Sequence, residues 1–290
     1  MEEFRHKIIR GKELAEHVLQ QLAQEVAALA AAKLRQPCLA VILVGNDSAS
    51  QVYVNNKKKA CDQVGIKSVA YGLSAATPQD DLVKLIRQLN NDATVDGILV
   101  QLPLPEHLAR RVVIDSILPT KDVDGFHRYN MGSLALGDPG IYPCTPQGVI
   151  YLLDSLKIEY PGKYVVILGM STIVGRPMAL ELINRGATVT LCNSKTKNVR
   201  EIIGQAEILV AAIGRPNFVH GSWLKEGCIA IDVGINRLEN GKLCGDIDWD
   251  SALRRVAWIT PVPGGVGPMT IAMLLKNTLH CYKLNTSKEI

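Results

Sequence analysis

The sequence contains no apolar run that approaches the roughly 18 residues of a membrane-spanning helix, although 47% of its 290 residues are hydrophobic. It also contains no long tract of one charge, since 32 basic and 28 acidic residues leave a net charge of +4. We therefore expect neither a membrane nor a nucleic acid as a partner. The small positive excess fits the attraction of anionic small molecules.

Paired cysteines are also missing. The seven cysteines never form a C-x-x-C pair, and most lie in apolar stretches, where cysteine behaves as a small core residue. They are Cys38, Cys61, Cys144, Cys192, Cys228, Cys244 and Cys281. This pattern indicates a reducing compartment and predicts neither a disulfide framework nor a metal site. Because the first residues lack the apolar core of a signal peptide, we expect a cytoplasmic protein.

Apolar runs alternate with amphipathic segments along the first half of the chain. Leucine and valine at helical spacing predict a helix over about 11–34, and the apolar run 38–44 predicts a buried strand. The same patterns predict a helix from about 48, a strand at 68–73, a helix at 78–91 and a strand at 97–101. Strands that alternate with helices indicate βαβ units and a largely parallel sheet.

The segment 119–147 is rich in glycine and proline and interrupts this alternation, so we expect it to connect two domains. We predict two α/β domains around a cleft, over 1–141 and 142–270, with the helix in 271–290 packed back on the first domain. The second domain should have a Rossmann-like parallel sheet. Its predicted elements are a linking helix near 147–156 and strands at 164–168, 187–192, 208–213 and 228–233.

The strand at 164–168 runs directly into a glycine turn, 169–177, that a helix follows. Glycine lets the backbone approach a pyrophosphate, and the free N–H groups and dipole of the helix N-terminus face the anion. The spacing differs from G-x-G-x-x-G, because Ser171 replaces the middle glycine. Turns of this composition also cap ordinary helices, so the turn alone leaves both interpretations open.

The end of the next strand indicates which dinucleotide would bind. A site that selects NAD usually carries an acid there, which accepts from the ribose 2′-hydroxyl. Here the segment 193–197 offers hydroxyls, an amide and two lysines, which suit a 2′-phosphate. The segment therefore favours NADP, with an ordinary polar loop as the alternative.

Tyr53 and Lys57 stand four residues apart on a predicted helix, so they project from one face. A lysine whose pKa is lowered by burial can act as a base near neutral pH, but the pair also fits an exposed helix face. Short-chain dehydrogenases carry the same pair downstream of their glycine loop. In this sequence the order is reversed, which argues against that family.

Two further segments have the composition of a site. Gln101 ends a predicted parallel strand, at the edge where ligands bind. Asp122 and Asp124 lie together in a loop, where they bind a ligand or merely form turns. No histidine or third acid lies at ligand spacing, so we expect no metal.

Six stretches resemble one family, the bifunctional methylenetetrahydrofolate dehydrogenase/methenyltetrahydrofolate cyclohydrolases. They occur in the family's order at 48–53, 97–105, 121–127, 143–146, 232–236 and 261–270, and the resemblance extends from about 11 to 278. It implies oxidation of 5,10-methylenetetrahydrofolate with NADP, hydrolysis of the methenyl product to 10-formyltetrahydrofolate, and a homodimer.

The resemblance also implies roles for particular residues. Lys57 would be the central catalytic residue, Gln101 would hydrogen-bond it and help to keep it neutral, and Tyr53 would flank the folate. Asp124 would hold the pterin, whose N–H edge a carboxylate can accept in a paired fashion. The loop with Pro263, Gly264 and Gly265 would lie between folate and nicotinamide. The implied cofactor-binding residues are Gly169, Ser171, Ile173, Val174, Gly175, Arg176, Ser194 and Ile235.

One position departs from the family pattern. Where relatives often have an arginine near the 2′-phosphate, this sequence has Met170, so Ser194, Lys195 and Arg176 are the candidates to replace it. Two rival functions are a dehydrogenase with a non-folate substrate and a non-catalytic nucleotide-binding protein. The acidic loop and the Tyr53–Lys57 pair argue against the first, and the joint presence of Lys57, Gln101 and Asp124 argues against the second.

Overall fold

The computed structural model describes residues 2–138 and 140–286, which form two compact units. One, here called the three-stranded unit, contains Glu16–Cys144 and the described residues from Ile271 on. The other, the five-stranded unit, contains the described residues up to Ala15 and Thr145–Thr270. Both are α/β units with parallel sheets, as predicted. Within the described ranges, no helix has the length and apolar character that a membrane crossing requires.

The sheet of the three-stranded unit has the order β2-β1-β3, and all its strands are parallel. Its strands are β1 (Cys38–Val44), β2 (Lys67–Leu73) and β3 (Gly97–Val100). The central strand β1 is apolar along its whole length, because helices cover both faces of a parallel sheet. Ile42 pairs with Val100, so β1 and β3 end side by side at one edge.

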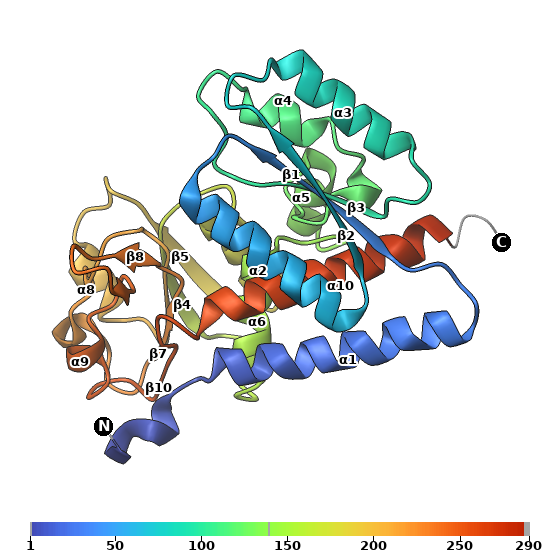
Figure 1. Ribbon diagram of the computed structural model, residues 1–290. Helices are drawn as coiled ribbons and strands as arrows, with labels where there is room; N and C mark the ends of the chain where they lie inside the picture. Colours follow the sequence, from blue (N-terminus) through green and yellow to red (C-terminus); the bar gives the residue numbers. More distant parts are fainter. Residues whose placement is uncertain (1, 139, 287–290) are drawn as a thin grey trace. The chain divides into compact units, whose positions relative to one another are not determined.

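The helices of this unit are α2 (Ser48–Val64), α3 (Gln79–Asn91), α4 (Arg110–Asp115) and α5 (Arg128–Leu136), with most of α1 (Gly11–Ala31) and of α10 (Val266–Thr286). Ile42 and Ile98 pack into one buried cluster with Leu82 and Ile86 of α3 and Val113 of α4. Figure 1 shows α3 and α4 together on that face of the sheet. The sheet is thereby held rigidly behind the edge at which β1 and β3 end.

An ion pair between exposed Arg35 and buried Asp96 ties the end of α10 to this sheet. Arg35 donates two hydrogen bonds to Asp96, at 2.7 and 2.6 Å, and the backbone N–H of Cys38 donates a third at 2.8 Å. The Arg35 guanidinium also lies 4.8 Å from the ring centroid of Tyr282, on α10. These contacts fix residues from three distant parts of the chain at the start of β1 and β3.

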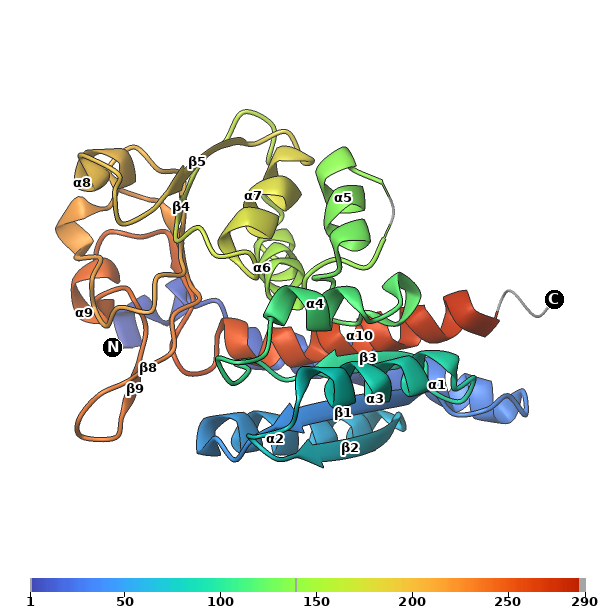
Figure 2. The same ribbon diagram turned by 90° about the horizontal axis from the view of Figure 1, so that it is seen from above.

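The sheet of the five-stranded unit has the order β10-β7-β6-β4-β5, again all parallel. Its strands are β4 (Tyr164–Leu168), β5 (Thr188–Cys192), β6 (Ile208–Ala211), β7 (Ile229–Asp232) and β10 (Trp258–Ile259). The helices are α6 (Cys144–Asp154), α7 (Gly175–Ile183), α8 (Val199–Ile203) and α9 (Trp249–Ala252), and β8 (Asn236–Arg237) pairs antiparallel with β9 (Leu243–Cys244). Short 3₁₀ turns lie at Glu2–Lys7, Pro119–Lys121 and Gly221–Trp223. Figure 2 shows β4 and β5 side by side within this unit.

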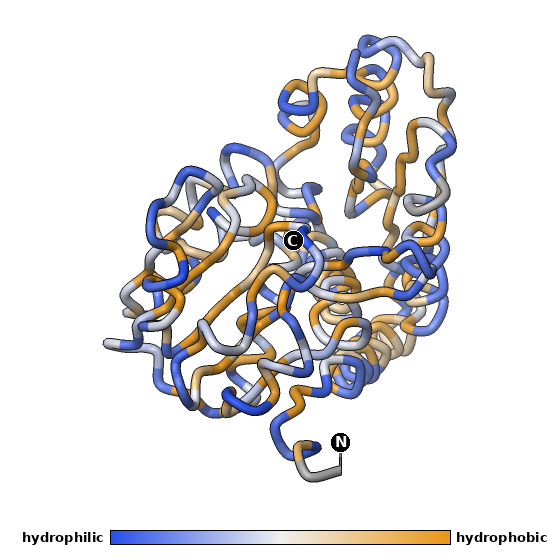
Figure 3. The backbone as a smooth tube through the Cα atoms, turned by 90° about the vertical axis from the view of Figure 1, so that its left-hand side faces the viewer, coloured by the Kyte–Doolittle hydropathy of each residue, from blue (hydrophilic) through white to orange (hydrophobic). Residues whose placement is uncertain are grey.

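The strand order reverses beside β4, which has β5 on one side and β6 on the other. Ligands of open parallel sheets bind outside the carboxyl ends of the strands at such a switch point. The loops after Leu168 and Ala211, which pair in the sheet, are therefore the expected place for a dinucleotide in this unit. Figure 3 shows apolar and polar stretches alternating along the chain, as helices around apolar strands require.

Two features differ from the sequence-based expectation. Residues 2–15, expected in the first domain, group with the five-stranded unit, because the backbone N–H of Ile9 bonds to the carbonyl of Ile259 on the edge strand β10. The glycine- and proline-rich segment 119–147 contains helix α5 and the start of α6. Gly137 ends α5 in the left-handed conformation. This glycine, which the sequence placed in a connecting loop, therefore caps a helix.

Candidate active site and dinucleotide site

Helix α2 carries the first two candidate residues. Asp47 caps its N-terminus, because the carboxylate accepts from the backbone N–H of Ser50 at 2.7 Å. Residues four apart share a helix face, and along this face Tyr53 is exposed, Lys57 is partly buried and Cys61 is fully buried. The face therefore leads from solvent into the unit, with the Lys57 amine at the boundary.

Gln101 meets Lys57 from the end of β3. The Lys57 amine donates a hydrogen bond of 2.9 Å to Oε1 of Gln101. The backbone N–H of Gln101 bonds to the carbonyl of Ile42 at 2.8 Å, and its side-chain nitrogen donates to the carbonyl of Leu102 at 2.7 Å. Because the amide nitrogen already faces a carbonyl, the amide oxygen is the atom left to accept from the lysine.

Asp124 acts on Lys57 through its charge. Removal from water lowers the pKa of Lys57, and the negative charge of Asp124 opposes that effect. Removal from water likewise raises the pKa of Asp124 from 3.8 to about 6, against the pull of Lys57. Burial thus moves both groups toward their neutral forms, which is the condition for a lysine to serve as a base.

The two acids of the loop have different surroundings. Asp122 is buried and accepts from the backbone N–H of His127 at 2.8 Å and from the side chain of Asn130 at 2.9 Å. Asp124 is partly buried, and within the described residues no group donates a hydrogen bond to it; its oxygens therefore stay accessible to water. Gly125 follows with a φ of +72°, and a Cβ there would lie 2.5 Å from the backbone of Tyr142. Asp122 therefore holds the loop, and Asp124 keeps its oxygens for another partner.

The glycine turn after β4 is tight enough to need its glycines. Gly169 has a φ of +106°, and a Cβ there would lie 2.1 Å from the carbonyl oxygen of Ala212. A Cβ on Gly175 would lie 1.7 Å from the carbonyl oxygen of Gly169. Ser171 accepts from the backbone N–H of Val174 at 3.1 Å, which closes the turn before α7 begins. This is the close strand–turn–helix approach that a pyrophosphate requires.

The loop after β5 lies against this turn. The side-chain nitrogen of Asn193 donates to the sulfur of Met170 at 2.9 Å, and Nε of Arg176 donates to the Met170 carbonyl at 3.2 Å. Ser194 and Lys195 are both exposed beside it. The structure therefore brings the candidate 2′-phosphate residues together with the turn, and Met170 lies between them.

The other candidates of the five-stranded unit lie on connecting loops. Ile235 follows β7 and is 46% exposed. Gly264 has a φ of +104°, and its carbonyl accepts from the backbone N–H of Lys12 at 2.9 Å. A Cβ on Gly265 would lie 2.5 Å from the carbonyl oxygen of Pro261, so the Pro263–Gly265 loop is held close to the backbone before it. Ile173 and Val174 are partly buried within the glycine turn.

Sequence analysis gave no role to two buried acids, Asp232 and Asp246. Asp246 accepts three backbone N–H groups of the loop after β6, and Asp232 accepts one from Gly234, after β7, and two from the residues after β9. The available signal was the pair of short words Asp-x-Gly at 232–234 and Gly-Asp at 245–246. Each places a glycine beside an acid that needs to approach backbone closely.

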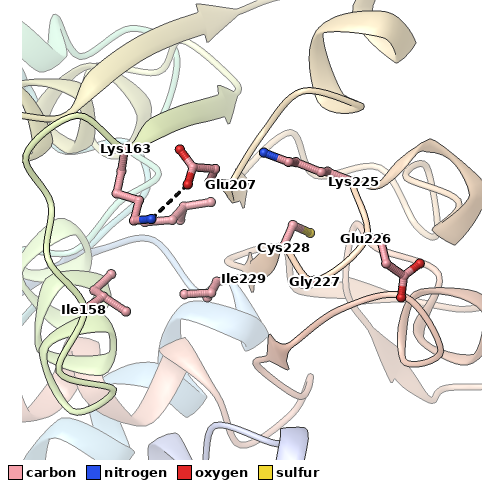
Figure 4. Close-up of a pocket in the computed structure, with 9 residues that line it drawn as sticks. Ile158, Lys163, Glu207, Lys225, Glu226, Gly227, Cys228 and Ile229 are labelled. Atoms are coloured by element: carbon pink, nitrogen blue, oxygen red, sulfur yellow. Dashed lines mark hydrogen bonds and ion pairs between the residues drawn. The ribbon is translucent and has the colours of Figure 1, made fainter.

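A pocket of about 290 Å³ lies at the opposite edge of the same sheet, where β6 and β7 begin. Figure 4 shows Lys163 paired with Glu207, at 2.9 Å, and Lys225 directed toward the same acid. Ligands of parallel sheets bind at the carboxyl ends of the strands. This pocket is at the amino ends, so it is not the dinucleotide site.

Comparison with known proteins matches both units to one family. The family described as "Tetrahydrofolate dehydrogenase/cyclohydrolase, catalytic domain" matches residues 9–124, and its "NAD(P)-binding domain" matches 143–286. The "Bifunctional protein FolD" of Neisseria gonorrhoeae is 53% identical over 279 residues, which cover 96% of this chain and 98% of that protein.

Solved structures agree. The bifunctional FolD methylenetetrahydrofolate dehydrogenase/cyclohydrolase of Campylobacter jejuni is 48% identical with a TM-score of 0.94, and covers 96% of this chain and 98% of its own. The Trypanosoma brucei enzyme, solved with NADP and an inhibitor, is 39% identical with a TM-score of 0.93 and the same coverage. This chain belongs to the tetrahydrofolate dehydrogenase/cyclohydrolase family.

Proposed function

We propose that this chain performs the folate chemistry of its family with residues of the three-stranded unit and binds NADP with residues of the five-stranded unit. The enzyme oxidises 5,10-methylenetetrahydrofolate to 5,10-methenyltetrahydrofolate with NADP, and hydrolyses that product to 10-formyltetrahydrofolate. Two groups of residues support this division best. Lys57, Gln101 and Asp124 come together in the three-stranded unit. In the five-stranded unit, the glycine turn lies against the Asn193–Lys195 loop.

Lys57 is the base that takes a proton from water in the hydrolytic step. Water that attacks the methenyl carbon must lose a proton, and a neutral amine can take it. The lowered pKa of Lys57 favours that neutral form, which also avoids repulsion of the methenyl cation. The Gln101 oxygen accepts one amine hydrogen and so directs the lone pair of the nitrogen away from Gln101.

Asp124 and Tyr53 bind the folate. The carboxylate of Asp124 has no donor among the described residues, and the pterin edge supplies N–H groups that a carboxylate accepts in a paired, charge-assisted way. Tyr53 lies one helical turn from Lys57 with its ring exposed, where it can stack against the flat part of the substrate.

The glycine turn and its neighbours fit NADP, which supplies the hydride acceptor when bound. Gly169, Ser171, Ile173, Val174, Gly175 and Arg176 surround the place of the pyrophosphate. Ser194, next to Lys195, binds the 2′-phosphate, since no acid occupies that position. Ile235 presents an exposed apolar side chain to the cofactor.

One assay tests the function as a whole. The purified chain is mixed with 5,10-methylenetetrahydrofolate and NADP, the absorbance of the methenyl product is followed, and the run is repeated with NAD at the same concentration. We expect NADP-dependent formation of methenyl product and then its decay by hydrolysis. If neither dinucleotide yields methenyl product, the proposed function is wrong.

We also propose a cytoplasmic homodimer. All seven cysteines fall within the described residues and none is in a disulfide, which suits a reducing compartment. The dimer is inferred from the family resemblance. Light scattering of the purified chain should give twice the 31.6 kDa mass of one chain, and a mass of one chain at micromolar concentration would contradict the dimer.

A further inference from the structure

The buried carboxylate of Asp246 collects four hydrogen bonds from two separate segments. One oxygen accepts from the backbone N–H groups of Ile213 and Gly214, at 2.7 and 3.1 Å. The other accepts from the N–H of Arg215 at 2.8 Å and from the side-chain nitrogen of Asn236 at 2.9 Å. Three consecutive N–H groups directed at one carboxylate fix the course of the backbone after β6.

Both segments border the dinucleotide site. β6 lies next to β4 in the sheet, and the carbonyl of Ala212 is directed at Gly169, the first residue of the glycine turn. In a trans peptide the N–H and C=O groups point in opposite directions. The bond from Ile213 N–H to Asp246 therefore also aims the Ala212 carbonyl at the turn. Asn236 directly follows Ile235, the exposed apolar residue after β7.

Asp246 is itself held by a second acid. Asp232 accepts from the backbone N–H groups of Gly234, Asp246 and Ile247, at 3.0, 2.9 and 2.8 Å. A Cβ on Gly234 would lie 2.3 Å from the Asp246 carboxylate, and one on Gly245 would lie 1.9 Å from an Asp232 oxygen. The Asp246 carboxylate thus fills the space of a side chain at position 234, and the Asp232 carboxylate fills that of a side chain at position 245. This explains why both positions are glycine.

We propose that Asp246 is a positioning residue for the cofactor: its carboxylate holds the Ile213–Arg215 backbone and Asn236 in the arrangement that NADP binds. The inference rests on the proposed binding of NADP by the five-stranded unit. Asparagine cannot replace the acid, because its NH₂ group would face N–H donors in place of an accepting oxygen. A carboxylate is required, although it brings a negative charge to the neighbourhood of an anionic cofactor.

The test measures NADP binding and hydrolysis separately. Isothermal titration of NADP into Asp246→Asn should show a Kd raised by about tenfold or more, which corresponds to the loss of one charge-assisted hydrogen bond. Hydrolysis of preformed methenyltetrahydrofolate, which consumes no NADP, should proceed at the parent rate. Asp250→Asn, an exposed acid four residues away, is the matched control and should bind NADP as the parent does.

The outcomes separate the possible failures. If the parent chain does not bind NADP, the proposed function fails; if the parent and Asp246→Asn bind equally, only the role of Asp246 fails. A parallel loss of hydrolysis would show that the carboxylate merely supports the fold, and would also overturn the proposal. If Asp246→Asn does not fold, Asn236→Ala tests the proposal instead, because it removes one donor and keeps the acid. It should raise the Kd about threefold, and parental binding would overturn the proposal.

Discussion

Replacement of Asp124 by asparagine removes a charge that the fold partly buries. In the folded protein the pKa of Asp124 is raised from 3.8 to about 6. The unfolded chain therefore loses this proton at a lower pH than the folded chain does. The stability cost is absent below pH 3.8, grows as the pH rises through 6, and is constant above that. At 1.36 kcal/mol for each pH unit, the cost reaches at most about 3 kcal/mol.

Asp124→Asn should therefore be more stable than the parent at pH 8, by up to about 3 kcal/mol, with roughly half of that gain at pH 5 and none near pH 3.8. The same variant should bind folate poorly, because each charge-assisted bond to the pterin is worth about 1.5–3 kcal/mol, or tenfold and more in KM. Stability and function are opposed at this position.

Urea unfolding at pH 4, 5 and 8 measures the first effect, and the KM for methylenetetrahydrofolate measures the second. Asp62→Asn, an exposed acid on α2, is the control and should stay within about 0.5 kcal/mol of the parent. A variant that gains no stability between pH 4 and pH 8 would refute the electrostatic reasoning. A nearly parental KM would show that Asp124 does not hold the pterin.

Three other changes test the remaining site residues. Lys57→Met should bring hydrolysis down by on the order of 10²–10⁴-fold while some dehydrogenase activity survives, so methenyl product accumulates; parental hydrolysis would rule out Lys57 as the base. Met170→Arg should lower the KM for NADP about tenfold and leave that for NAD unchanged, because position 170 lies against the Asn193 loop; equal effects on both would place the 2′-phosphate elsewhere. Gly175→Ala should abolish NADP binding, because its Cβ would lie 1.7 Å from the Gly169 carbonyl. Gly132→Ala, in open space on α5, should be neutral or stabilising by about 0.5–1 kcal/mol. NADP binding by Gly175→Ala at parental affinity would mean that the turn tolerates a side chain.

The regular strands were the part of the fold that the sequence predicted best. The predicted strands at 38–44 and 164–168 coincide with β1 and β4, because a strand buried on both faces is an unbroken apolar run with a turn signal after it. Helix α5 was missed, since Gly132 lies inside it and Gly137 ends it. A local pattern also could not show that residues 2–15 join the five-stranded unit, because Ile9 bonds to Ile259, far along the chain.

The site, like the fold, was only partly predictable from the sequence. The spacing of Tyr53 and Lys57 predicted a shared helix face, but it could not supply the partner of the lysine. Gln101 is 44 residues away in sequence, and only the ends of neighbouring elements bring the two side chains to 2.9 Å. The lowered pKa of Lys57 depends on burial in the folded unit, a property that no single segment of sequence carries.

The acids of the protein can be sorted by the donors that the fold gives them. A carboxylate taken out of water is costly unless hydrogen bonds replace its hydration. Asp96 accepts from Arg35 and from the N–H of Cys38, and Asp122 accepts from the N–H of His127. Asp246 accepts backbone N–H groups of the loop after β6, and Asp232 accepts those of Asp246 and Ile247.

Asp124 is the exception. Partial burial raises its pKa to about 6, and no described residue donates a hydrogen bond to it, so its oxygens stay accessible to water. In sequence, Asp122 and Asp124 are two acids in one loop, and no pattern distinguishes them. In the fold, the donors that stabilise Asp122 are already in place, whereas the accessible oxygens of Asp124 are open to a donor from outside the chain. This difference supports the proposed binding of the pterin by Asp124.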